Sequence, residues 1–462
     1  MKLAAPGRLD VDDRPGAVAA GQRRLRGHLV DAVLVLSLAG TGAVVGSGYY
    51  ATATAGSRPE FYQVEFGPAV MEACGRGFVN PVPATVPALT QFLTQQRTTL
   101  DCAGIPANVR LTRLAPVHVA FRYMMLVVST YWRATGVSWD HLAPIFGGLH
   151  GLVVGLGYLA LRVVLARWLA VALSVALALS PAQLSILPFL RDSAKTPFFV
   201  ADALIVLLVW TRPLTTRTVV LLSGLFGLVA GIGVGFRPDV VMWFPMLAMA
   251  LLFARHASLG RRLTATALGL AVSAGALGVF GWPILAQYKS GSNFGHVALL
   301  GFAREFDTRL GVRSGPYTIT PFYNDEYVYA AITSYAKRKG YAGDLQLMSA
   351  DYERYGSTYY REVTRTFSAD VATRLGASVV RVLNLPFEPQ DDASDAAVKS
   401  APALHLLIQT RRQVLGALDG WGPYLVLLAF LMFAARSAAL AWGFAITVLC
   451  LAGLPLVQFH PR

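Results

Sequence analysis

Apolar residues in this chain are gathered into long runs that short charged segments separate. The clearest runs lie at residues 32–48, 141–161, 168–187, 197–211, 218–235, 239–254, 263–285, 422–435 and 438–456. An α-helix needs about 20 mainly apolar residues to cross a bilayer, and most of the runs approach that length. The pattern predicts an all-α polytopic membrane protein with about nine transmembrane helices.

Composition agrees with this class. Hydrophobic residues make up 55% of the chain and charged residues only 14%, which is outside the range of soluble domains. A β-barrel would instead show short alternating segments. The net charge of +14 indicates arginine-rich cytoplasmic loops rather than nucleic-acid binding. Since arginine far outnumbers lysine, the composition is typical of GC-rich bacterial genomes.

Two large polar segments, 49–140 and 286–421, interrupt the runs. Inside the first, residues 116–132 (PVHVAFRYMMLVVSTYW) are nearly apolar but include His118 and Arg122. We expect this stretch to be a helix lying in the membrane interface, and the alternative is a further span.

The second polar segment also contains an amphipathic pattern. Apolar residues in Tyr359–Leu385 recur on one helical face, and basic residues flank that face. The spacing predicts one helix on the membrane surface. The flanking residues are Arg361, Arg365, Arg374 and Arg381.

The charges of the short linkers set the topology. Linkers 162–167, 212–217 and 255–262 carry arginine without aspartate or glutamate, whereas 191–195 and 237–239 each contain aspartate. The positive-inside rule places the arginine linkers in the cytoplasm. Treating residues 116–132 as a span would reverse this pattern.

This topology divides the chain into four parts in a bacterial cytoplasmic membrane, with a cytoplasmic N-terminus and two exoplasmic segments. We expect the basic tail to lack regular structure. The parts are a tail at 1–28, a membrane module at 29–285 with its first exoplasmic loop at 49–140, an exoplasmic segment at 286–421 and a transmembrane hairpin at 422–462.

Two exoplasmic turns concentrate charge at the bilayer edge, where charged side chains usually contact polar groups. Arg191, Lys195 and Arg237 are candidates for binding a phosphate, since arginine offers a two-pronged donor and lysine a compact charge. The alternative is that they pair with Asp192 and Asp239 and with lipid head groups.

The aspartates of the turns and spans are the remaining candidates there. Asp192 and Asp239 could orient the three cations. No cofactor is required by the pattern, and Mg²⁺ or Mn²⁺ held by these aspartates is left open. Asp202, inside a predicted span, is expected to pair with a neighbouring arginine.

The order of segments resembles a known family. A basic tail and a first span precede a long exoplasmic loop with glutamates, an interfacial helix, a turn at Gly136, and helical hairpins with charged exoplasmic turns. Across residues 32–285 this layout is similar to the GT-C superfamily of membrane glycosyltransferases, in particular protein O-mannosyltransferases and aminoarabinose transferases. The resemblance implies transfer of a sugar from a polyprenyl-phosphate carrier to an exoplasmic lipid, envelope glycan or protein.

The resemblance also implies a carboxylate in the first loop. The family typically has an acidic pair followed by a tyrosine, whereas residues 58–68 (RPEFYQVEFGP) contain the single glutamates Glu60 and Glu65. Glu65 is our first candidate for a catalytic residue because apolar neighbours can raise its pKa toward that of a useful base. Glu60 is the second, and His118 and Arg122 could support either from one helix face or simply snorkel.

The remaining motifs limit which functions the sequence allows. Cys74 and Cys102 share one exoplasmic loop, where disulfides form, so we expect them to be bonded. The sequence has no Walker loop, Rossmann fingerprint or zinc spacing. Two other functions stay open, namely a transporter or flippase for a lipid-linked anionic substrate and a non-catalytic scaffold. The sequence does not indicate an oligomeric state.

Overall fold

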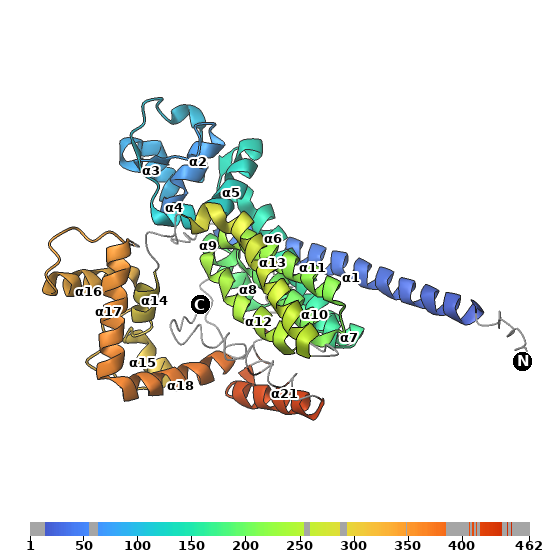
Figure 1. Cartoon of the computed structure of the whole chain (residues 1–462). Helices are drawn as coiled ribbons and strands as arrows, with labels where there is room; N and C mark the ends of the chain where they lie inside the picture. Colours follow the sequence, from blue (N-terminus) through green and yellow to red (C-terminus); the bar gives the residue numbers. More distant parts are fainter. Residues whose placement is uncertain are drawn as a thin grey trace, which may run out of the picture.

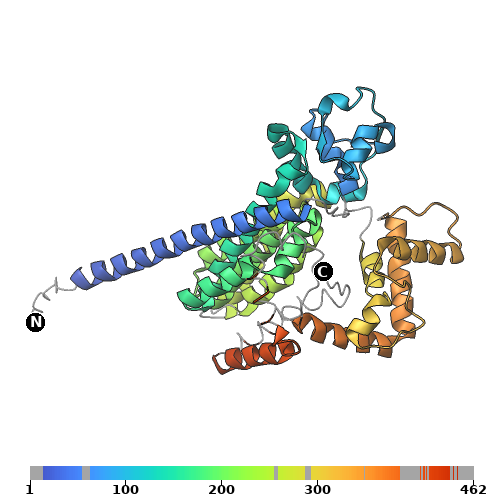
Figure 2. The same cartoon turned by 180° about the vertical axis from the view of Figure 1, so that it is seen from behind.

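The computed structural model describes residues 14–54, 63–253, 259–286, 293–347, 349–384 and, beyond these, 406, 409, 410, 413, 416–436, 441 and 445. Nearly all regular structure in these parts is helical, and the strands are two residues long. Figures 1 and 2 show a bundle of long helices, a compact group of short helices α2–α5 beyond one end of it, and a further helical group α14–α18.

Five stretches of the described chain are long and apolar enough to cross a membrane, so the fold is that of a multi-pass helical membrane protein. Two lie inside one long helix each, Gly27–Ala51 in α1 (Arg14–Thr54) and Gly260–Leu285 in α13 (Leu259–Leu285), and Thr216–Val234 is α11. Asp140–Val164 ends with α6 (Ala143–Val164), and Leu190–Thr211 comprises α9 (Leu190–Ser193) and α10 (Thr196–Thr211). Large apolar side chains project outward from them, as lipid-facing residues do: Leu36 is 73% exposed, Val44 74% and Val279 72%.

Three shorter apolar helices correspond to other predicted spans. They are α7 (Arg167–Ala178), α12 (Phe244–Phe253) with the preceding 3₁₀-helix η5 (Pro238–Trp243), and α21 (Gly422–Arg436). The predicted run 168–187 is not one helix, because Pro181 has no N–H to continue α7 and starts α8 (Pro181–Ile186) instead. Most of the predicted span 438–456 lies outside the described residues.

Small residues let α1 and α6 approach closely. A Cβ atom on Gly147 would collide with the backbone of Ala43, and one on Gly151 would collide with the carbonyl oxygen of Ala39. Close backbone packing of this kind is a main source of helix association in membranes, where apolar burial gives little gain. The tail prediction is wrong in part, since α1 is helical from Arg14.

The first long loop, which the sequence predicts to be exoplasmic, folds into a small domain with its own core. Phe92 stacks on Trp139 at 4.9 Å between ring centroids, and Trp132 meets Trp139 edge-on at 5.2 Å. The indole N–H of Trp132 donates to Ser138 and that of Trp139 to Phe92, at 2.7 and 2.9 Å. Buried indoles with satisfied N–H groups give this loop a defined shape.

The elements of this small domain are short. The strand β1 pairs antiparallel with β3, and β2 with β4. The helices are η1 (Gln63–Phe66), α2 (Gly67–Ala73), η2 (Pro83–Thr85), α3 (Pro87–Leu93), η3 (Cys102–Gly104), α4 (Pro116–Ala120), α5 (Arg122–Thr135) and η4 (Asp140–Leu142), and the strands are β1 (Asn80–Pro81), β2 (Thr99–Leu100), β3 (Leu111–Thr112) and β4 (Val137–Ser138).

The predicted interfacial helix at 116–132 is two helices, because α4 ends and α5 begins at Phe121 (φ −106°, ψ 19°). Neither is among the stretches long enough to span. The topology that depends on this segment not crossing the membrane stays a prediction.

The second polar segment, predicted to be exoplasmic, forms a helical module around Ile332 and Tyr352, which are fully buried. The single surface helix predicted at 359–385 is wrong, since the chain bends at Phe367 (φ −120°, ψ 43°). Val363, Phe367 and Val371 of this face pack in the module's own core, whereas Leu375 is 39% exposed. The helices are α14 (Phe294–Leu300), α15 (Glu305–Leu310), α16 (Asp325–Arg338), α17 (Ala350–Thr366) and α18 (Ser368–Asn384).

Arg374 does not flank a membrane face as predicted. Its side chain is 4% exposed, and its guanidinium donates to Asp307 at 2.5 Å and to the carbonyl of Ala303 at 3.0 Å. A buried ion pair is tolerated when its donors and acceptors are satisfied in this way. Arg374 is thus an internal tie between α18 and α15.

Candidate functional site

The α4–α5 joint lies against the turn that follows α11. The carbonyl oxygen of Gly235 accepts hydrogen bonds from the amides of Tyr123 and Met124, at 3.0 and 3.3 Å. The Tyr123 hydroxyl donates to the carbonyl of Phe280 in α13, at 2.6 Å. The first loop is therefore hydrogen-bonded to the turn that carries Arg237 and to α13.

The other charged turn meets the same joint. The guanidinium of Arg191 lies over the ring of Phe121, 5.3 Å from its centroid. Leu190, Ala194 and Phe236 are buried in one apolar cluster with the core of the first loop. Three segments far apart in the sequence thus lie together, as the shared topology of the linkers predicts.

Glu65 is paired with His118 within this assembly. Oε2 of Glu65 lies 2.8 Å from Nε2 of His118, whose side chain is 4% exposed while that of Glu65 is 33% exposed. The amide of Ala115 donates to Nδ1 of His118 at 3.0 Å. Because Nδ1 accepts, the neutral ring carries its proton on Nε2 and donates it to Glu65.

This geometry assigns different roles to the two residues. Both ring nitrogens of His118 are engaged, so His118 cannot take a proton from a substrate. Glu65 has one oxygen held by His118 and remains partly open to solvent. The arrangement presents Glu65 as an oriented carboxylate, which is what a general base requires.

The three candidate cations form one network with two aspartates. Asp192 pairs with Arg237, and Asp239 accepts from Lys195 at 2.7 Å and from Nε of Arg237 at 3.1 Å. Arg191 lies 3.9 Å from Asp192. These side chains are between 18% and 28% exposed.

The network matches the salt-bridge alternative, and it still carries an excess of positive charge. Of these five side chains, three carry a positive charge and two a negative charge. A partly buried cationic surface of this kind attracts an anion more strongly than a fully solvated one. Direct contact of any of these residues with a phosphate stays a prediction.

The same ion pairs bear on the metal that the sequence left open. Asp192 and Asp239 both contact Arg237, so a divalent cation between them would have to displace the guanidinium. Across the residues that the structure describes, groups of three or more His, Cys, Asp or Glu side chains that could hold a metal are not found. The residues do not fit a divalent cation here.

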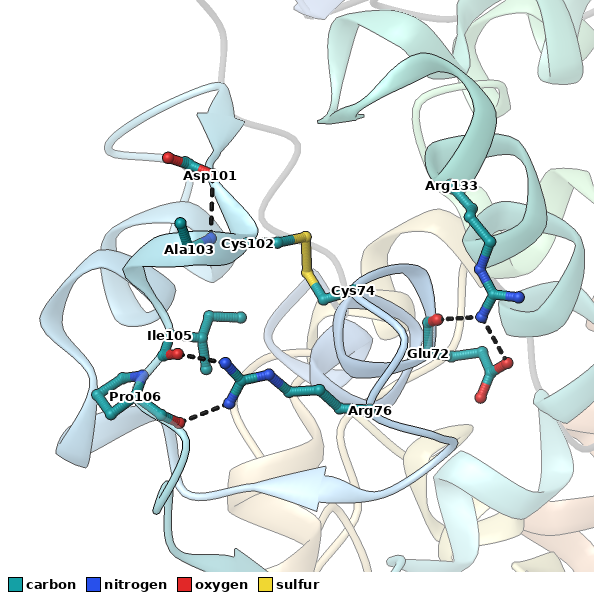
Figure 3. The surroundings of a disulfide bond; sticks show 9 residues. All are labelled: Glu72, Cys74, Arg76, Asp101, Cys102, Ala103, Ile105, Pro106 and Arg133. Carbon is teal, nitrogen blue, oxygen red and sulfur yellow. Dashed lines mark hydrogen bonds and ion pairs between the residues drawn. A yellow bond between two sulfur atoms is a disulfide. The ribbon is translucent and has the colours of Figure 1, made fainter.

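The disulfide prediction is confirmed, since Cys74 is bonded to Cys102 (Figure 3). The bond ties the end of α2 to η3, and Arg76 donates to the carbonyls of Ile105 and Pro106 beside it. This cross-link rigidifies the loop that holds η1 and Glu65.

Three other charged residues of the first loop are placed differently. Glu60 lies outside the described residues. Glu72 accepts from Arg133 at 3.0 Å and so belongs to a separate pair (Figure 3). Arg122 lies over the ring of Phe78, 5.5 Å from its centroid, and not beside Glu65.

One buried polar residue was not found by sequence reasoning. Gln63, two residues before Glu65, is 3% exposed, and its Oε1 has no hydrogen-bond partner in the described chain. Asp202 was predicted to pair with an arginine, and this is wrong. It is fully buried in α10, and neither carboxyl oxygen has a hydrogen-bond partner among the described residues.

A second charged cluster marks the opposite end of the bundle. Asp31 in α1 accepts from Arg167 at 2.8 Å and from the hydroxyl of Tyr158 at 2.7 Å, and Arg162 lies 3.5 Å away. The arginine linker 162–167 therefore lies near the start of the apolar stretch Gly27–Ala51 of α1, away from the first loop. This agrees with the alternation of linkers in the predicted topology.

The site thus consists of an oriented carboxylate, an excess positive charge and a fastened loop, all at one end of a membrane bundle. Comparison of the chain with protein families, with curated proteins and with solved structures finds no match.

Proposed function

We propose that the protein is a membrane glycosyltransferase that takes a sugar from a polyprenyl-phosphate carrier and transfers it to an exoplasmic acceptor. The observation that carries the proposal is the docking of the α4–α5 joint on the Gly235 turn, which brings the Glu65–His118 pair and the cationic network to one end of the bundle. The layout of the first seven predicted spans, which resembles the GT-C superfamily, supplies the reaction class.

In this proposal Glu65 removes the proton from the acceptor hydroxyl. The acceptor oxygen then bonds to the anomeric carbon as the bond from that carbon to the phosphate oxygen breaks. The bonding electrons leave with the polyprenyl phosphate, and Lys195 and Arg237 stabilise its added charge. His118 keeps the Glu65 carboxylate in place.

The cationic network can respond to such a ligand without new residues. A phosphate oxygen would compete with the carboxylates of Asp192 and Asp239 for the same guanidinium and ammonium donors. Charge-assisted bonds to phosphate are among the strong ones, and the fork of Arg237 suits them. The ion pairs would therefore keep these side chains in position until the sugar donor binds.

The proposal is tested by reconstituting the purified chain with a panel of radiolabelled polyprenyl-phosphate sugars and following release of the polyprenyl phosphate. Release by the wild type and loss in Glu65→Gln supports it. Glu72→Gln is a matched control, since Glu72 lies in the same loop but pairs with Arg133. Equal activity of both variants would remove Glu65 from the reaction.

A transporter is the second candidate, and two observations in the bundle favour it. The α7–α8 break leaves the carbonyl of Ala178 to accept from His150 at 3.0 Å, and Asp202 lies buried in α10. Broken helices and buried carboxyls are typical of transport paths. Uptake of a polyprenyl-phosphate lipid across proteoliposomes, abolished in Asp202→Asn, would favour this function over transfer.

A further inference from the structure

Two aromatic rings project from the second exoplasmic module where α16 begins. Phe322 is 59% exposed and Tyr327 is 46% exposed, and their ring centroids lie 6.5 Å apart. Burial of either ring by a bound partner would be favourable, since each presents a large apolar area. The pair therefore needs an explanation beyond a solvated turn.

The loop that carries the rings is held by hydrogen bonds and by ring packing within the module. The Thr320 hydroxyl donates to the carbonyl of Phe322 at 2.9 Å, and the amide of Tyr323 donates to Glu305 at 2.9 Å. The Tyr323 ring packs on Phe306, 5.4 Å between centroids. Because a pinned loop loses little entropy on binding, these contacts preorganise the exposed rings.

Carboxylates stand beside the rings in the first turn of α16. Asp325 is held by Nε2 of His296 at 2.8 Å, yet its side chain is 48% exposed. Glu326 is exposed, and its amide is capped by the Asn324 side chain at 2.7 Å. The surface therefore combines apolar ring faces with oriented hydrogen-bond acceptors.

We propose that Phe322 and Tyr327, with Asp325 and Glu326, form a binding surface for a neutral glycan chain. A pyranose or furanose ring presents C–H bonds that pack on an aromatic face and hydroxyls that donate to carboxylates. The two rings are spaced for one sugar or two adjacent ones. The carboxylates disfavour acidic glycans and the anionic surface of a membrane as occupants.

The inference rests on the proposed function for its role, because such a surface would hold the glycan part of an acceptor. Its chemistry does not depend on catalysis. Binding can therefore be measured without a donor, in a Glu65→Gln background that cannot transfer sugar. Failure of the transfer assay and failure of glycan binding are then separate results.

The test uses the full chain in nanodiscs of zwitterionic lipid, titrated with mannohexaose, arabinohexaose and galactohexaose, with hexagalacturonate as the acidic control. We expect at least one neutral hexasaccharide to bind and the acidic one not to bind. Phe322→Ala and Tyr327→Ala are each expected to weaken binding by about three- to tenfold. Tyr424→Ala, which removes a 66% exposed tyrosine elsewhere, should leave it unchanged.

A Phe322→Trp variant gives a second readout, since its fluorescence should change when a sugar covers the ring and stay constant if none does. The proposal is overturned if no neutral hexasaccharide binds or if both alanine variants bind like the wild type. A photo-crosslinking side chain at position 322 that labels lipid or a protein in intact cells, and no glycan, would also overturn it.

Discussion

Nε2 of His118 donates to a carboxylate oxygen of Glu65 at 2.8 Å, while the backbone amide of Ala115 occupies the other ring nitrogen. This pair joins η1 to α4 and fixes both the tautomer of the ring and the orientation of the carboxylate. In the proposed reaction, Glu65 is thus a base held in a fixed orientation, and His118 has a positioning role.

The first prediction separates these two roles. Glu65→Gln should lower kcat of sugar transfer by about 10²–10⁴-fold with little change in KM for the donor, since it removes the base. His118→Ala should lower kcat by about tenfold or more, because it removes a hydrogen bond to a charged group. Steady-state kinetics in proteoliposomes measures both.

His118→Gln provides the control for this prediction. A glutamine amide can donate to Glu65 while its oxygen accepts from Ala115, so activity should recover toward the wild-type value. If glutamine and alanine at this position behave alike, the positioning role of His118 is wrong.

The second prediction concerns Arg237, which bridges Asp192 and Asp239. Arg237→Ala leaves two half-buried carboxylates near each other, so we expect unfolding to become about 1–3 kcal/mol easier. It should also raise KM for the donor by about tenfold or more, through the lost phosphate contact. Thermal unfolding and donor titration are the two measurements.

The double variant Arg237→Ala with Asp192→Ala distinguishes a structural from a binding role. Removing one carboxylate should restore much of the lost stability but should not restore the KM. Recovery of both would mean that Arg237 acts only within the network.

The sequence predicted local features well, and it failed where tertiary contacts decide. Apolar runs and two cysteines in one loop act through length and compartment, so most spans and the disulfide followed from pattern. Arg374 fits an amphipathic surface helix by spacing, yet it is buried because Asp307 lies opposite it. No sequence pattern places the amide of Ala115 at His118, so the tautomer could not be predicted.

The disulfide supports the third prediction. Replacing Cys74 and Cys102 by serine should make unfolding of the first loop about 2–4 kcal/mol easier, since the bond restricts the unfolded loop. The loop should then become sensitive to limited proteolysis from the exoplasmic side. Cys450→Ser is the control, and mass spectrometry after thiol blocking should find only this third cysteine modified in the wild type.

The fourth prediction is a pH dependence in the second module. Lys339 donates to Glu362 at 2.9 Å, which lowers the pKa of Glu362 below its ordinary 4.5 and raises the pKa of Lys339 above its ordinary 10.5. A lowered carboxyl pKa gives stability that is present above 4.5 and is lost as the pH falls through the folded value. A raised lysine pKa gives stability that is present below 10.5 and is lost as the pH rises through the folded value.

The stabilisation by this pair should therefore be constant between about pH 6 and 9 and should decline on both sides. The melting temperatures of the wild type and Glu362→Gln should differ by a small, steady amount inside this window, because the pair is exposed. The two should converge toward pH 3. A difference that grows in acid would contradict the assignment.

The last prediction uses Asp202 to choose between the two candidate functions. Its carboxyl is fully buried in α10 without a hydrogen-bond partner in the described chain. Burial of an unpaired polar group lowers stability, so a functional role would explain why it is there. Asp202→Leu should raise the melting temperature, by an amount that corresponds to about 1–3 kcal/mol. If the protein is a glycosyltransferase with its site at Glu65, Asp202→Leu and Asp202→Asn should both retain sugar transfer. If both variants lose lipid uptake while Glu65→Gln retains it, Asp202 lies on a transport path and the transporter is the better assignment.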